Sequence, residues 1–389
     1  MRVLISGGGT GGHVYPALSV ATQLRDQYNA DILYLGSDDG LETQLVPAAG
    51  LRLEVIKAGR LRRYLSWQTL QGIGRVPLGM IQAVGIVRRF HADVAFTSGG
   101  YVAVPAGLAA RLNGVSLLMH QQDVPPNLSN RLLAPLATKI SVAFEDSRQF
   151  FPAQKTLLLG NPVRSEIMAM RQVTSQQARE RLGFDAALPL LLVTGGSQGA
   201  RHLNRVTCEA LPQLLQWCQV LHISGNKLFA ETQTLSDPQV AGLDEHIRQR
   251  YRLVPYMSDE MPFALQAADL VMCRAGASTV SELAALQKPS ILVPLPPAIG
   301  KSPQEANAAM VERRQAAEVI ANDTLNAPLL VERARDIITQ PERMQQMQTA
   351  LRELAKPMAA QDIVETVVHM ARGSGPIEKR TPEQKILSI

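Results

Sequence analysis

The sequence is poor in cysteine and in aromatic residues. Only 3 of its 389 residues are cysteine, and Cys208, Cys218 and Cys273 show no CxxC spacing, so neither a disulfide framework nor a zinc site is indicated. A reducing compartment fits this cysteine content best. Aromatic residues make up 4% of the chain and hydrophobic residues 46%, a balance that suits helices packed on buried parallel strands.

Long apolar runs are also missing. The longest uncharged run, from Val94 to Ala110, contains three glycines and a proline, so it indicates a strand, a loop and a helix. The first residues of the chain form a strand and a glycine turn, which leaves no room for an export signal. We therefore expect neither a transmembrane helix nor export by a signal peptide.

Positive charge is only slightly in excess over negative charge. The net charge is +5, which is compatible with nucleic acid, an anionic membrane face or a phosphate-bearing substrate as a partner. A length of 389 residues exceeds what one hydrophobic core usually serves, so two domains are expected.

Short apolar runs alternate with helical stretches in two series, which predicts an α/β fold with parallel sheets covered on both faces. In the first series we expect strands at Val3–Ser6, Ile32–Leu35, Val94–Thr97, Ser116–His120 and Lys139–Val142. In the second series we expect them at Leu190–Thr194, Val220–Ser224, Tyr251–Val254, Leu270–Cys273 and Ser290–Val293. The series predict two Rossmann-like domains that face each other across a cleft.

The segment from Gly160 to Arg164 lies between the two series and is the expected hinge. We expect an N-terminal domain over residues 1–160 and a C-terminal domain over 161–359. A helix over 360–372 would pack back on either domain, and the N-terminal domain is a candidate. The polar tail over 373–389 is expected to be disordered.

The first predicted strand leads into Gly7-Gly8-Gly9-Thr10-Gly11-Gly12-His13, and we expect a helix to begin near Pro16. Glycines let the backbone approach a ligand, and free amides at a helix start attract phosphate oxygens. No acidic residue clearly ends a second strand to hold a dinucleotide ribose. The loop therefore favours a phosphate ligand over a nicotinamide cofactor.

Two further loops repeat this arrangement. Ser98-Gly99-Gly100-Tyr101 follows one predicted strand, and Gly195 to Ala200 follows another. Since ligands of open α/β sheets lie beyond the carboxyl ends of the strands, the three loops predict a cleft for several phosphates. A nucleotide diphosphate and a second phosphorylated molecule would together supply these phosphates.

Six motifs together resemble the MurG family, the glycosyltransferase family 28 enzymes that complete the lipid-linked precursor of bacterial peptidoglycan. The resemblance covers about residues 1 to 370. Its motifs are GGGTGGHVYPAL (Gly7 to Leu18), GLETQLVP (Gly40 to Pro47), SGGYVAVPAGLAA (Ser98 to Ala110), GNPVR (Gly160 to Arg164), GGSQGARHLN (Gly195 to Asn204) and CRAGASTVSELAA (Cys273 to Ala285).

The resemblance implies the two-domain glycosyltransferase-B architecture and inversion at the sugar carbon, with no metal or other cofactor. It implies UDP-N-acetylglucosamine as donor and undecaprenyl-diphosphate-linked muramoyl-pentapeptide as acceptor, in cell wall synthesis. The expected location is the cytoplasmic face of the membrane, with peripheral binding to its anionic surface and no nucleic acid partner.

The family's donor site maps onto residues from both halves of the chain. These are Thr10, Gly11, Gly12, Arg164, Ser197, Gln198, Ser258, Ala277, Ser278, Thr279, Val280, Ser281, Glu282 and Gln304. Glu282 follows a turn at an expected helix start, where a carboxylate can accept two ribose hydroxyls while the amides meet the diphosphate. A plain first-turn glutamate is the alternative. Arg164 pairs either with substrate or with a neighbouring carboxylate.

The chain departs from the family at three places. Asp123 stands where the family usually has an asparagine that contacts the donor sugar, so an amide is exchanged for a charge. Residues Lys301 to Pro303 replace the usual acidic and histidine residues before Gln304, although Gln304 and Asn307 remain. Ser258 replaces an apolar residue at a donor contact.

Inverting transfer needs one base for the acceptor hydroxyl and donors for the departing diphosphate. His13 is the first choice of base because its usual pKa lies near working pH, and Asp123 is the second. A loop-fixing role for His13 is the alternative. Rival functions are a lipid glycosyltransferase or UDP-sugar 2-epimerase of the same fold, or a catalytically silent membrane-bound scaffold.

The segment from Arg60 to Arg89 is expected to dock on the membrane. Five arginines border an apolar run that is too short to span a bilayer but suits its interface. An ordinary core helix with basic ends is the alternative.

Overall fold

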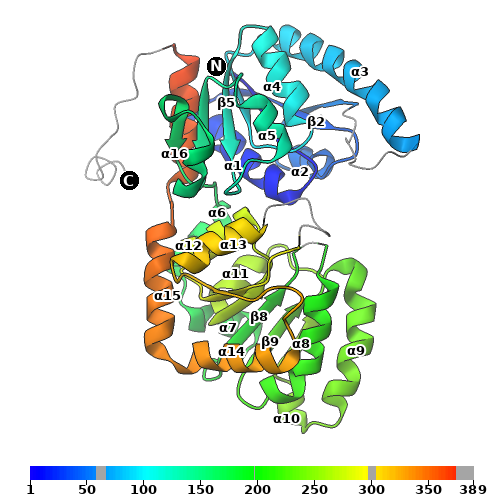
Figure 1. Ribbon diagram of the computed structural model, residues 1–389, viewed down its shortest axis with the longest axis vertical. Coiled ribbons are helices and arrows are strands. Elements are labelled where there is room, and N and C mark those ends of the chain that lie inside the picture. Colours follow the sequence, from blue (N-terminus) through cyan, green and yellow to red (C-terminus); the bar gives the residue numbers. More distant parts are fainter. Residues whose placement is uncertain (58–66, 197, 297–303, 374–389) are drawn as a thin grey trace.

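The computed structural model describes residues 1–57, 67–196, 198–296 and 304–373, with side chains of the helix at 67–90 described from residue 78 onward. Two α/β domains lie one above the other in Figure 1, each with its own sheet. The predicted fold class is therefore confirmed. No helix in the described ranges has the length and apolar character needed to span a bilayer.

The N-terminal domain contains a seven-stranded parallel sheet in the order β3-β2-β1-β4-β5-β6-β7. Its strands are β1 (Arg2–Ser6), β2 (Asp31–Ser37), β3 (Arg52–Ile56), β4 (Val94–Thr97), β5 (Ser116–Gln121), β6 (Lys139–Val142) and β7 (Thr156–Leu158). Its helices include α1 (Gly11–Tyr28), α2 (Glu42–Ala48), α3 (Trp67–Phe90), α4 (Ala103–Leu112), α5 (Leu128–Leu133) and the 3-10 turns η1 (Glu145–Phe150) and η2 (Ala153–Lys155).

The C-terminal domain contains a six-stranded parallel sheet in the order β10-β9-β8-β11-β12-β13. Its strands are β8 (Leu190–Thr194), β9 (Gln219–Ile223), β10 (Tyr251–Val254), β11 (Leu270–Cys273), β12 (Ser290–Leu292) and β13 (Glu318–Val319). The helices are α6 (Ser165–Ala169), α7 (Ser175–Leu182), α8 (Arg201–Leu214), α9 (Phe229–Ala241), α10 (Glu245–Arg248), α11 (Met261–Ala267), α12 (Ala277–Leu286), α13 (Gln304–Arg313), α14 (Ala327–Thr339) and α15 (Pro341–Leu354), with the 3-10 turns η3 (Met170–Gln172) and η4 (Asn226–Leu228).

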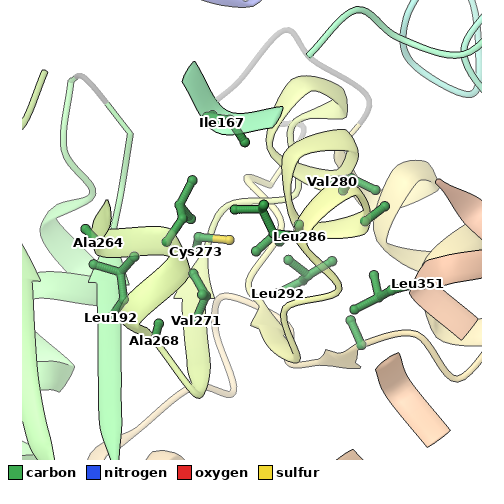
Figure 2. Packing of buried hydrophobic residues seen from close by; sticks show 14 of the residues in the cluster. Ile167, Leu192, Ala264, Ala268, Val271, Cys273, Val280, Leu286, Leu292 and Leu351 are labelled. Atoms are coloured by element: carbon green, nitrogen blue, oxygen red, sulfur yellow. The ribbon is translucent and has the colours of Figure 1, made fainter. Parts of the chain in front are cut away.

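Each sheet is buried on both faces because successive side chains of a strand point to opposite sides. On β1, Leu4 belongs to one apolar cluster while Val3 and Ile5 belong to another. On β8, Leu192 and Leu191 are divided in the same way between two clusters. Figure 2 shows the first of the C-terminal clusters, with residues of β8, β11, α12 and α15 packed together.

The chain crosses between the domains twice. The first crossing follows β7, and the second joins α15 to the last helix, α16 (Ala359–Ala371). Ile363, Val364 and Val367 of α16 are buried in the same cluster as Val14 and Ala17 of α1, so this helix packs on the N-terminal domain (Figure 1). We propose domain boundaries at 160/161 and 359/360, next to these crossings.

The expected start of α1 near Pro16 is wrong, because the helix begins at Gly11 and contains Pro16. The amides of His13 and Val14 already bond the carbonyl of Thr10. A proline inside a helix lacks the amide that would bond the carbonyl four residues earlier. The carbonyl of Gly12 is thereby left without its helical partner.

Candidate active site

The first two glycine loops form one surface above β1 and β4. The Gly8 amide donates to the Gly99 carbonyl at 3.4 Å, and Gly100 takes a φ of +87° to lie against Gly8. A side chain at residue 100 would collide with the Gly8 carbonyl, so glycine is required there. The buried carboxylate of Glu42 accepts a hydrogen bond from the Gly9 amide at 3.1 Å. These contacts fix the backbone that leads into α1.

The starts of α1 and α12 meet at the interface between the two domains. The Ser278 hydroxyl of α12 donates to the Gly12 carbonyl of α1 at 3.3 Å, which is the carbonyl that Pro16 leaves free. The same hydroxyl lies 3.4 Å from Gln122 Oε1. Helix starts carry unpaired amides and partial positive charge, so this junction attracts anions.

His13 lies at this junction, on the first turn of α1. Its Nδ1 lies 2.9 Å from the Ser98 carbonyl, which can only accept, so Nδ1 carries the proton. Burial lowers the pKa of His13, while Asp123, the Ser98 bond and Glu42 act in the opposite direction. The neutral ring therefore presents a lone pair on Nε2, and in the described part of the chain we find no hydrogen bond to that atom.

Asp123 lies in the loop after β5 and reaches the C-terminal domain. Its Oδ1 accepts from Asn307 Nδ2 at 2.8 Å, and Asn307 Oδ1 in turn accepts the amide of Val124 at 2.9 Å. Burial raises the pKa of Asp123, opposed by Asn307, His13 and the Ala277 amide. His13 and Asp123 are thus close enough to influence each other's charge.

Arg164 and Glu282 form an ion pair beside the hinge, with Arg164 Nε 3.3 Å from Glu282 Oε1. The side chains are 25% and 17% exposed, and the guanidinium lies 5.2 Å from the centre of the Tyr15 ring. Burial raises the pKa of Glu282, and Arg164 opposes that shift. The carboxylate expected to bind ribose therefore already has a cationic partner.

The remaining predicted residues lie around this centre. Thr10 is exposed in the first loop. Gln198 is exposed on the third loop, between Gly196 and Gly199, which have φ values of +78° and +74°. Ser258 is exposed after β10. Gln304 begins α13 and accepts the Leu295 amide at 2.9 Å. Ser197 and the departure at 301–303 lie outside the described residues.

The start of α12 supplies the largest group of predicted residues. Ala277, Val280 and Ser281 build its first turns, with the Ser281 hydroxyl bonded to the Ala277 carbonyl at 2.8 Å. Ser278 and Thr279 are half-buried there. The described structure therefore brings His13, Gly12, Asp123, Arg164 and this helix start together, and it shows no bond from Ser258 or Gln198 to them.

Comparison with known proteins agrees with this geometry. The glycosyltransferase family 28 N-terminal domain matches residues 3–142, and the C-terminal domain of that family matches residues 190–367. A UDP-N-acetylglucosamine–N-acetylmuramyl-(pentapeptide) pyrophosphoryl-undecaprenol N-acetylglucosamine transferase from Caldanaerobacter subterraneus subsp. tengcongensis is 38% identical over 93% of this chain and 96% of its own length. The chain belongs to glycosyltransferase family 28.

Solved structures extend the likeness to three dimensions. MurG from Acinetobacter baumannii superposes with a TM-score of 0.74 at 29% identity, over 94% of this chain and 99% of that one. A UDP-GlcNAc 2-epimerase from Neisseria meningitidis gives a TM-score of 0.68 at 14% identity, over 95% and 100% of the two chains. The second likeness concerns the fold alone. Resemblance to the MurG family and its glycosyltransferase-B architecture is confirmed.

Sequence reasoning left several organising residues of this family 28 site without a role. Gln122 donates to the Ser98 carbonyl at 2.9 Å, and Asn307 joins the domains. Tyr15 lies under Arg164, and Glu42 holds the first loop. Tyr15 and Glu42 lie inside quoted motifs, Gln122 precedes Asp123 and Asn307 follows Gln304 by three residues, but only the folded chain shows what these residues contact.

Proposed function

We propose that this protein is an inverting glycosyltransferase that moves N-acetylglucosamine from UDP-N-acetylglucosamine to undecaprenyl-diphospho-N-acetylmuramoyl-pentapeptide. The observation that carries the proposal is the meeting of two helix starts from different domains beside a neutral histidine and an Arg–Glu pair. Such a junction supplies a base on one side and anion binding on the other. The choice of donor and acceptor is supported by the names of the relatives, which contain both molecules.

In the proposed reaction the acceptor hydroxyl attacks the anomeric carbon and the bond from that carbon to the UDP oxygen breaks. The hydroxyl proton passes to Nε2 of His13, with Asp123 as the alternative base. Negative charge accumulates on the departing diphosphate, where the first amides of α12 and the Arg164 guanidinium stabilise it. Glu282 accepts the ribose hydroxyls.

The other predicted donor residues take supporting positions. The amides of Gly11 and Gly12 face the phosphates, and Ser197 and Gln198 of the third loop contribute hydrogen bonds to them. Ser258 and Gln304 contact the nucleoside and the sugar, with Gln304 using Nε2 because its oxygen already accepts the Leu295 amide. Thr10 precedes the amides of Gly11 and Gly12 and completes the donor site with its hydroxyl.

The decisive experiment incubates the purified protein with UDP-N-acetylglucosamine and the undecaprenyl-linked muramoyl-pentapeptide. We expect a lipid product that is heavier by one N-acetylglucosamine residue and release of one UDP for each product formed. An epimerised sugar that forms without acceptor would favour the 2-epimerase, and UDP binding without turnover would favour a silent scaffold. Transfer to diacylglycerol would favour a lipid glycosyltransferase.

We further propose that the α3–α4 patch, formed by Leu78, Ile81 and Leu112, binds the inner face of the membrane. Ile81 is 70% exposed and Leu112 is 67% exposed, and Asn113 Nδ2 joins the end of α4 to the Val84 carbonyl of α3. The described part of the predicted docking segment therefore exposes large apolar side chains to solvent, as membrane-binding surfaces do. Residues 60–66 of that segment lie outside the described residues.

Replacing both exposed arginines at the end of α3, in R88Q/R89Q, should release much of the protein from vesicles that contain phosphatidylglycerol. Each arginine near an anionic surface contributes on the order of 1 kcal/mol, so the pair changes binding by about thirtyfold. Co-sedimentation at low and moderate salt measures the effect. The matched control R201Q/R205Q removes the same charge from α8, and equal retention of both variants would contradict docking through α3.

A further inference from the structure

The loop that follows β5 places a carboxylate from one domain against two helices of the other. Asp123 Oδ1 accepts from Asn307 Nδ2 of α13 at 2.8 Å, and the nearby Ala277 amide at the start of α12 acts to lower the pKa of the carboxylate. Asn307 is fully buried, and its Nδ2 also donates to the Ala275 carbonyl at 3.1 Å. The carboxylate is therefore fixed by the C-terminal domain, although its own backbone belongs to the N-terminal domain.

The start of α12, where this carboxylate lies, stabilises negative charge. The first amides of a helix have no partner within the helix and carry partial positive charge. Ala277 is the first residue of α12, a helix of 10 residues. The Ser278 hydroxyl of the same turn contacts Gly12 and Gln122 of the N-terminal domain, so the start of α12 lies against the segment that carries Asp123.

A second set of contacts closes the same interface. Arg313 Nη2 lies 2.8 Å from Asp146 Oδ1, and Arg314 pairs with the other oxygen of Asp146. Asp146 belongs to η1 of the N-terminal domain, whereas Arg313 is the last residue of α13 and Arg314 follows it. Helix α13 therefore holds the domains together at Asn307 and again about 9 Å along its axis, at 1.5 Å per residue.

We propose that the Asp123 carboxylate is a built-in anion that lies at the start of α12 before the donor binds and must leave when the donor's diphosphate binds. This inference rests on the proposed function, which places that diphosphate at α12. Two anions cannot share the same amides, so Asp123 competes with the diphosphate while it links the two domains through Asn307. Donor binding then breaks the Asp123–Asn307 contact.

The test compares the affinities of UDP and uridine by calorimetry in the wild type and in D123N. Asparagine keeps the shape and can still accept from Asn307, but it removes the competing charge. An anion at a helix start is stabilised enough to change affinity by about 2- to 30-fold, so D123N should bind UDP tighter by that factor. Its affinity for uridine, which has no phosphate, should stay as in the wild type. D123S serves if D123N does not fold.

The control variant D146N loosens the same interface without touching α12. If Asp123 only held the domains together, D123N and D146N would change the affinities for UDP and uridine alike. That result, or equal UDP affinity in the wild type and folded D123N, would overturn the inference and leave the proposed function standing. If the wild type and all variants failed to bind UDP, the proposed function and the inference would both be wrong.

Discussion

Replacing His13 with alanine is expected to lower turnover about a hundredfold or more while UDP affinity stays nearly unchanged. The Ser98 carbonyl holds the proton on Nδ1, so the ring can accept a proton only at Nε2, and alanine removes that acceptor. UDP does not contact the His13 ring in our proposal, so its affinity is insensitive to the change. Steady-state turnover and calorimetry with UDP measure the two effects separately.

The pH profile of the wild type gives an independent check on this role. Burial lowers the pKa of His13 below its usual 6.5, so the free base persists to a lower pH than an exposed histidine would allow. Turnover should therefore be present above the lowered pKa and be lost as pH falls through it. Because the Asp123 charge raises the pKa of His13, D123N should move this acid limb to lower pH.

Asp123 is the rival base, and its own variant separates the two assignments. Loss of turnover in D123N together with a nearly normal H13A enzyme would reverse the roles. H13Q is the matched control for packing, because it retains a polar side chain near Ser98 but has no titratable nitrogen. If H13Q turned over as fast as the wild type, proton transfer to His13 would be excluded.

Most central strands could be predicted from sequence because both of their faces are buried. Leu190–Thr194 is buried at every position and was predicted with the same bounds. The three strands that were not predicted lie at sheet edges: β3 has the sequence Arg-Leu-Glu-Val-Ile and is only partly buried, β7 has three residues, and β13 has two. Charged residues in a half-exposed edge strand weaken the apolar signal on which the prediction depends.

The candidate site could be predicted residue by residue but not contact by contact. Arg164 and Glu282 are 118 residues apart in sequence, and Asp123 and Asn307 are 184 apart. No local pattern reports that such residues meet, since the contacts depend on how two separately folded domains close. Nor does sequence reveal the tautomer of His13, which the Ser98 carbonyl determines.

For Glu282, the contacts seen in the structure change the expected effect of a substitution. From sequence it is a carboxylate for ribose, whereas in the structure it is also the partner of Arg164 and mostly buried. A half-buried arginine that loses its partner retains its charge, so the E282A protein should lose some stability as well as ligand affinity. Thermal unfolding and UDP binding must therefore be measured on the same samples.

In folded E282A, UDP binding should weaken by about 1.5–3 kcal/mol, the scale of hydrogen bonds to a charged group, which corresponds to roughly a 10- to 150-fold loss. The decisive control is 2′-deoxy-UDP, which lacks one of the two hydroxyls that the carboxylate accepts. Wild-type protein should prefer UDP over the deoxy nucleotide, and E282A should bind the two alike, because the group that distinguishes them is gone. E282Q keeps an acceptor oxygen without the charge, so its preference for UDP over 2′-deoxy-UDP should lie between those of the wild type and E282A. If E282A still preferred UDP by the wild-type factor, the ribose contact would have to come from another residue, and Glu282 would remain only the partner of Arg164.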